Sequence, residues 1–290
     1  MHLHPYRLAR PRALLAFLGI AGLAIGRLAP AQDFQPGCAL PFDSIKVAHP
    51  IDHLCPRARG NVPDPPVAAN DAAHALQNER KNNFCATGGP ALVTFFSFKK
   101  LQQKLDQKTP DAKHWTRINL PADRSVFSDV YTTTGGDTLG EGSVVRFAAW
   151  VMMLRGNSVE SCNCETSGKN EDTDIHVVLI SSSDRENTAE CSSVTAEVSP
   201  HLRPEIWDAH NLLLANAHPL RFTGQLFYDA AHRPCSGNPP TAASQTPARV
   251  SSWEVHPVYA IDVCKKKSLQ KCKANDESAW TPLDQWQPDE

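Results

Sequence analysis

Runs of apolar residues in the second half of the chain predict a set of β-strands. Five such runs follow one another after Gly140, and glycine, proline, serine or asparagine residues separate them. One segment of helical pattern, PEIWDAHNLLLANA, lies between the third and fourth runs and opens at Pro204, which suits a first helical position. The predicted strands span residues 143–154, 173–180, 193–198, 220–228 and 252–263. The helical spacing places Ile206, His210, Leu213, Leu214 and Ala217 on one face.

The order of these elements indicates a fold. Three strands, a helix and two further strands make the order of the oligonucleotide/oligosaccharide-binding (OB) barrel. We therefore predict a mainly β protein with some helix, in which residues 139–264 form an OB-like five-stranded barrel.

The regions on either side of the barrel have different patterns. For residues 32–138 we predict a small, partly helical and partly irregular region held by disulfides. One of its helices is expected to be capped by Asp71. A strand is expected at 91–96, and Ser97 is expected to cap a second helix that buries Phe98. Residues 265–290 form a polar tail, which Cys272 is expected to tie to the barrel.

The first 31 residues have the pattern of a secretory signal peptide. Arginines precede an uncharged run at 13–26, which is too short to span a bilayer, and Ala29-Pro30-Ala31 offers a cleavage site. We expect cleavage after Ala31 and a secreted or periplasmic protein with no stable membrane span. An uncleaved membrane anchor is the alternative, because Arg27 directly follows the apolar run.

Net charge and cysteine content indicate which kind of partner to expect and whether the cysteines form disulfides. The formal net charge is -2, which argues against a nucleic-acid partner. All nine cysteines follow the expected cleavage site, so disulfides are the first interpretation and zinc the rival, although two C-x-x-C pairs are absent. Spacing does not decide which cysteines pair.

Strand alternation gathers the candidate site residues. The side chains of Asp174 and His176 share one face of their strand, and Glu197 takes the corresponding face of the next. Glu254 and His256 occupy the same face of the last strand. Because these strands are neighbours in an OB barrel, we expect one continuous, water-facing outer surface.

Carboxylates and imidazoles in this mixture are what a divalent metal ion or an acid/base pair requires. The expected metal ligands are Asp174, His176, Glu254 and His256, with Glu197 as the candidate catalytic base and one divalent cation as the cofactor. Further residues past the strand ends are expected to line the site: His201, Arg203, Asp229 and His232. The competing interpretation is a set of exposed, hydrogen-bonded pairs without a ligand.

Several stretches resemble a family of exported bacterial proteins of uncharacterised function. They are GEGSVVRF, TDIHVVL, CSSVTAEVSPHLRP, RFTGQLFYDAAHRPC and SSWEVHPVYAIDVC, with CALPFDSIK and LQNERKNNFCATG nearer the N-terminus. The resemblance covers residues 38–264, and the D-x-H and W-E-x-H-P strands are its most specific parts. It implies the OB-like fold and no particular activity.

Two function hypotheses follow, with a structural component of the cell envelope as a third. The first is a binding module that presents the outer face of the barrel to a small polar ligand, a glycan or another protein. The second is a metal-dependent hydrolase, for which phosphoesters are one substrate class. Both would use the same face of the barrel.

Overall fold

The computed structural model describes residues 71–73, 77, 80–81, 89–116, 119–121, 123–155, 173–200, 203–237 and 248–288. The predicted signal peptide, His201 and the first five cysteines lie outside the described residues.

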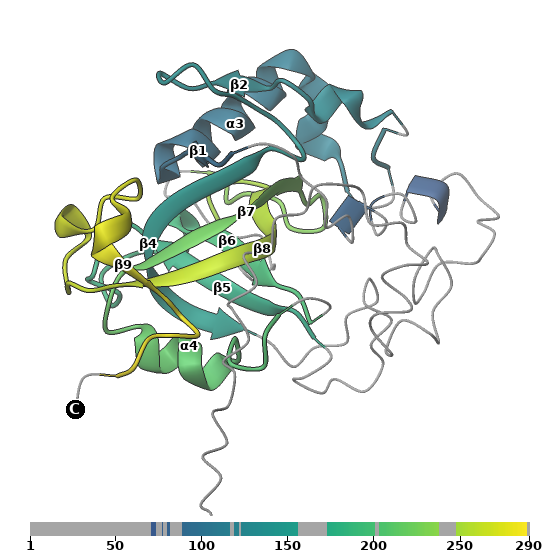
Figure 1. The fold of residues 1–290 in the computed structure, drawn as a ribbon. Coiled ribbons are helices and arrows are strands. Elements are labelled where there is room, and N and C mark those ends of the chain that lie inside the picture. Colours follow the sequence, from purple (N-terminus) through teal and green to yellow (C-terminus); the bar gives the residue numbers. More distant parts are fainter. Residues whose placement is uncertain are drawn as a thin grey trace, which may run out of the picture. The chain divides into compact units, whose positions relative to one another are not determined.

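Five long strands close into a barrel (Figure 1). Around the barrel the strands run in the order β4, β5, β6, β8, β7, and β7 pairs with β4. The β6–β8 pair is parallel, and the other four pairs are antiparallel. This is the OB arrangement, and it confirms the predicted fold class. The strands are β4 (Val144–Arg155), β5 (Ile175–Ile180), β6 (Val194–Val198), β7 (Leu220–Tyr228) and β8 (Trp253–Cys264).

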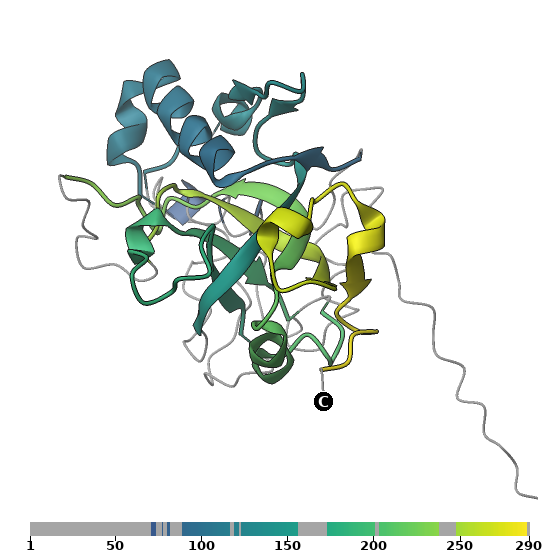
Figure 2. The same cartoon turned by 90° about the vertical axis from the view of Figure 1, so that its left-hand side faces the viewer.

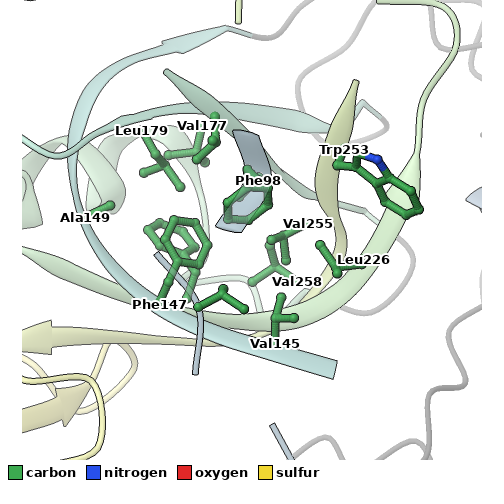
Figure 3. Close-up of a cluster of buried hydrophobic side chains, with 14 of the residues drawn as sticks. Phe98, Val145, Phe147, Ala149, Val177, Leu179, Leu226, Trp253, Val255 and Val258 are labelled. Atoms are coloured by element: carbon green, nitrogen blue, oxygen red, sulfur yellow. The ribbon is translucent and has the colours of Figure 1, made fainter. Parts of the chain in front are cut away.

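Apolar residues that alternate with polar ones along the strands fill the barrel interior. Ile175, Val177 and Leu179 of β5 all belong to the buried core, as the two-residue period predicts. Phe98 reaches this core from outside the barrel strands, and its ring meets Phe147 edge-on at a centroid distance of 5.3 Å. Figure 3 shows the Phe98 ring among side chains from β4, β5 and β8.

Helix α3 (Phe95–Lys108) brings Phe98 to the barrel and begins earlier than predicted. Thr94 is its N-cap, and the hydroxyl of Ser97 accepts a hydrogen bond from the Thr94 amide at 3.2 Å. Ser97 is therefore the third helical residue, so its prediction as the cap is wrong. The apolar stretch at 91–96 is divided between this helix and a two-residue strand, β1 (Ala91–Leu92), which pairs with β4.

Helix α4 (Ala209–Ala215) lies at the end of the barrel opposite α3 (Figures 1 and 2). It starts five residues after Pro204, because the Asp208 side chain caps it by accepting from the Asn211 amide at 2.7 Å. Its buried residues are Leu212 and Ala215. His210, Leu213, Leu214 and Ala217, which the helical spacing places on one face, are all exposed.

The C-terminal segment continues the sheet instead of trailing as a tail. Strand β9 (Trp280–Pro282) pairs with β8, and the Cys264–Cys272 disulfide confirms the expected tie. A second disulfide joins Cys191 to Cys235. The remaining elements are β2 (Tyr131–Thr132), β3 (Thr138–Leu139) and the 3-10 turns Pro110–His114, Arg124–Phe127, Glu190–Ser192, Leu269–Lys271 and Glu277–Ala279.

Among the described residues, no helix has both the length and the apolar character needed to cross a membrane.

Candidate functional site

The predicted site residues of β5, β6 and β8 share one face of the barrel wall, but that face is not open to water. The side chains of His176 and Glu197 belong to directly opposite residues of β5 and β6. The expectation of a water-facing surface is wrong, because Asp174, Glu197, Glu254 and His256 are all at most 1% exposed. The helical residues Gln77 and Lys81 place their side chains against this outer surface.

Glu197 is the centre of the first half of the site. Its Oε1 lies 2.9 Å from Nε2 of His176, and its Oε2 lies 3.0 Å from Nδ1 of His256. The ammonium nitrogen of Lys81 lies 2.7 Å from the same Oε2 and 3.5 Å from Oδ2 of Asp174. One buried carboxylate therefore meets a lysine and two imidazoles, and Lys81 bridges it to a second carboxylate.

Three residues of this half bring possible metal-ligating atoms together. One atom each from Asp174, Glu197 and His256 lies within 4.8 Å of the other two. Two of them, Asp174 and His256, are among the predicted ligands. The third residue of the group is Glu197, which was predicted as the catalytic base, and not Glu254, which was predicted as a metal ligand. His176 contacts Glu197 from the partly exposed side of the group, with 10% of its side chain exposed.

Arg249 and Asp229 organise the second half of the site. Nη1 of Arg249 donates to Oε2 of Glu254 at 2.6 Å, and Nη2 donates to Oδ2 of Asp229 at 2.7 Å. Asp229 also contacts Nδ1 of His232 at 2.6 Å and accepts from Nε2 of Gln77 at 3.1 Å. Two residues predicted to line the site, Asp229 and His232, are therefore in contact with each other. Glu254 belongs to this half of the site through Arg249.

The two halves lie beside each other. The imidazole rings of His176 and His232 meet edge-on, with centroids 6.4 Å apart. His232 is 27% exposed at its side chain, so it forms the most accessible part of the acid and imidazole group. The site therefore consists of buried carboxylates behind two imidazoles that reach its rim.

Burial and neighbouring charges push the carboxyl pKa values apart. Burial raises the pKa of Glu254, and the carboxylates of Glu197 and Asp229 raise it further. Burial also opposes ionisation of Glu197, but His176 and Lys81 outweigh it and hold the pKa of Glu197 well below its usual range. Asp229 has its pKa lowered in the same way by His232 and Arg249. Carboxyl groups with opposite shifts in one site are typical of acid/base chemistry.

Arg203, another residue predicted to line the site, contacts the backbone beside the strands. Its Nη1 donates to the backbone oxygens of Thr173 at 2.8 Å and Val198 at 3.3 Å. These contacts tie the start of β5 to the end of β6. Arg203 therefore supports the strands that carry the site.

A pocket of about 550 Å³ opens next to the connection that carries Asp229 and His232. Its wall combines side chains of α3, including Gln102 and Asp106, with Tyr228, Arg233 and Ser252 of the β7–β8 region. The Gln102 side chain accepts a hydrogen bond from the Ser252 amide at 2.9 Å, which fixes the helix against this connection. The pocket has room for a small polar molecule.

Sequence reasoning missed Gln77, Lys81 and Arg249. Arg249 precedes β8 in a region of serine, threonine and proline, where no periodic pattern marks a residue as buried. Lys81 follows Arg80 in a segment that reads as a polar helix surface. Charge balance was the available signal, since several acids on one covered face require cationic partners.

Comparison with known proteins found no matching family model, no matching curated protein and no matching solved structure.

Proposed function

We propose that this chain is an exported binding protein whose ligand site is the outer face of β5 and β6, together with the β7–β8 connection. OB folds bind ligands on their second and third strands and on the loop between the fourth and fifth. In this barrel those elements are β5, β6 and, in the β7–β8 connection, the described residues 229–237 and 248–252. The concentration of Asp174, His176, Glu197, Asp229 and His232 on these elements is the observation that carries the proposal.

The ligand chemistry follows from charge. Asp174 and Glu197 are both fully buried, and Lys81 is the cation that contacts them both. The face therefore favours a group that is positively charged and donates hydrogen bonds. We propose a small polar ligand with an amine or guanidine group, which would contact the imidazole rim and, in place of the Lys81 ammonium group, the two carboxylates.

A thermal-shift panel tests this proposal. Spermidine, lysine, arginine and glucosamine are the cationic probes, and glucose is the neutral one. We expect at least one cationic probe to raise the melting temperature, and glucose to leave it unchanged. The Lys81→Met/Glu197→Gln double variant should lose the response, while Glu186→Gln, an exposed control, should keep it. A response to glucose that survives in the double variant would favour a glycan site elsewhere.

The export part of the proposal is supported by the predicted leader and by the disulfides, because both are typical of proteins that leave the cytoplasm. The Cys191–Cys235 and Cys264–Cys272 pairs fit an oxidising compartment. Expression of the full chain followed by mass spectrometry of the secreted or periplasmic fraction tests the idea. We expect a mature product beginning at Gln32, and an intact N-terminus in that fraction would contradict it.

A metal-dependent hydrolase is the second candidate. The closeness of ligating atoms from Asp174, Glu197 and His256 favours it. A model phosphodiester, bis(p-nitrophenyl) phosphate, incubated with the protein and Zn²⁺ or Mn²⁺ tests it. Hydrolysis that disappears in His256→Ala would support this candidate, and equal rates with and without the protein would reject it for this substrate class.

A further inference from the structure

We infer that a divalent cation binds between Asp174, Glu197 and His256 in exchange for the ammonium group of Lys81. This inference rests on the proposal that this face of the barrel binds a ligand. It goes further by naming the ion's ligands, the residue that occupies its place, and the competition between them.

Three atoms that could ligate one ion lie close together. They lie within 4.8 Å of one another, on β6, on β8 and directly before β5. Oxygen and imidazole ligands bind Zn²⁺ at about 2.0–2.2 Å, so two ligands of one ion lie roughly 3–4 Å apart. We expect small side-chain rotations to close the difference when the ion binds.

Lys81 supplies the second observation. Its ammonium nitrogen contacts both carboxylates of the group, at 2.7 Å from Glu197 and 3.5 Å from Asp174. One ammonium group therefore contacts two buried carboxylates. A divalent cation balances both, and it gains the His256 nitrogen as a third ligand. Two carboxylates with one imidazole suit Zn²⁺, Mn²⁺ or Co²⁺ better than Ca²⁺ or Mg²⁺.

A buried oxygen of Glu254, in the second half of the site, also lacks a hydrogen-bond partner among the described residues. Glu254 is fully buried two residues before His256, on the same face of β8, and its Oε1 has no hydrogen-bond partner among the described residues. Buried polar atoms without a partner are uncommon and point to a missing ligand or water. A water bound to the ion would give this oxygen a donor.

The contact between His176 and Glu197 also fits a metal site. His176 contacts Oε1 of Glu197 at 2.9 Å from outside the group of three ligands. Residues that orient a ligating carboxylate in this way commonly tune metal affinity. We therefore expect His176 to hold the Glu197 carboxylate in position without binding the ion.

Co²⁺ titration followed by visible absorption tests the exchange. The full chain is purified without an affinity tag, freed of metal with a chelator and dialysed. We expect Lys81→Met to bind one Co²⁺ at least about tenfold more tightly than the wild type, because the competing ammonium group is gone. Lys81→Met/Glu197→Gln should lose this binding. Arg80→Met removes a charge from the adjacent exposed residue, so it should match the wild type.

A second measurement uses the unmodified protein and does not depend on how the variants fold. Saturating Zn²⁺ should speed hydrogen exchange in the segment containing Gln77 and Lys81, because displacement of Lys81 removes its anchor, and chelator should reverse the change. Unchanged exchange on Zn²⁺ binding would overturn the inference. So would equal Co²⁺ affinity in Lys81→Met and Arg80→Met, or Co²⁺ binding that survives in the double variant.

These outcomes separate the inference from the proposed function. If an amine probe raises the melting temperature and no variant binds Co²⁺, the exchange is wrong and the binding proposal stands. If Co²⁺ binds as expected and no amine does, the site is a metal site and the organic ligand is wrong. If neither binds, both fail.

Discussion

The ammonium nitrogen of Lys81 lies 2.7 Å from Oε2 of Glu197, in contact with the outer wall of the barrel. The Glu197 side chain has no exposed surface, and the Lys81 side chain has 11%. The pair thus connects a helical residue of the N-terminal region to β6. It explains why a face that alternation alone would place in water is buried.

Breaking this pair from either side should destabilise the protein strongly. Lys81→Met and Glu197→Gln should each lower the free energy of unfolding by about 3–5 kcal/mol, because each removes one member of a buried ion pair and leaves the other charge buried without this contact. The double variant should lose less than the sum of the two, since neither charge remains. Urea denaturation of the metal-free protein at pH 7 measures all three, with Arg80→Met as the control. Losses below about 1 kcal/mol in both single variants would mean that the pair behaves as an exposed one.

The Asp229 carboxylate should make the stability fall at low pH. His232 and Arg249 hold its pKa below the ordinary value of 3.8 despite burial. A carboxyl whose folded pKa is lowered contributes stability above its unfolded pKa and loses it as the pH falls through the folded value. Asp229→Asn removes this contribution. We therefore expect the difference in unfolding free energy between wild type and Asp229→Asn to be largest near pH 7 and to shrink below about pH 4. A difference that stays constant from pH 7 to pH 3 would contradict this assignment.

The barrel was predictable because its signal is local and repeated. The two-residue period of β5 places Val177 and Leu179 inside and His176 outside, and the same rule places Glu197 on β6. Because the order of strands and helix fixes which strands are neighbours, the association of Asp174, Glu197 and His256 could be predicted as well. Only the register was needed in addition, and the structure supplies it.

The burial of the site was not predictable, because a distant segment causes it. Gln77 and Lys81 precede Asp174 and Asp229 by many residues, and the polar pattern around them resembles an exposed helix. Arg249 gave no periodic signal either. The start of α4 was missed for a local reason: Pro204 and Asp208 both suit a helix start, and the Asp208 side chain makes the cap.

Gly224 is a position where a side chain should not fit. A Cβ there would lie 2.4 Å from Cγ1 of Val255 and 2.5 Å from the backbone oxygen of Pro257. The β7–β8 register shifts at this point, so the two strands approach closely around the glycine. We expect Gly224→Ala to lower the free energy of unfolding by about 1–3 kcal/mol or more through overpacking. Gly89→Ala is the matched control, because nothing lies within 4 Å of its added Cβ. Equal urea midpoints for the two variants would show that β8 moves aside without cost.

The two disulfides should contribute unequally to stability. Cys191–Cys235 closes a loop with a sequence separation of 44, whereas Cys264–Cys272 spans only 8. A cross-link restricts the unfolded chain more when its loop is longer, which predicts about 4 kcal/mol for the first and about 2.5 kcal/mol for the second. Paired serine substitutions at each bridge, compared by urea denaturation under oxidising conditions, measure both values. The long bridge also anchors residues beside the pocket lined by Tyr228 and Arg233, so its loss should weaken binding of a cationic probe that uses this region. The reverse order of stability losses would indicate that the unfolded chain is already compact between Cys191 and Cys235.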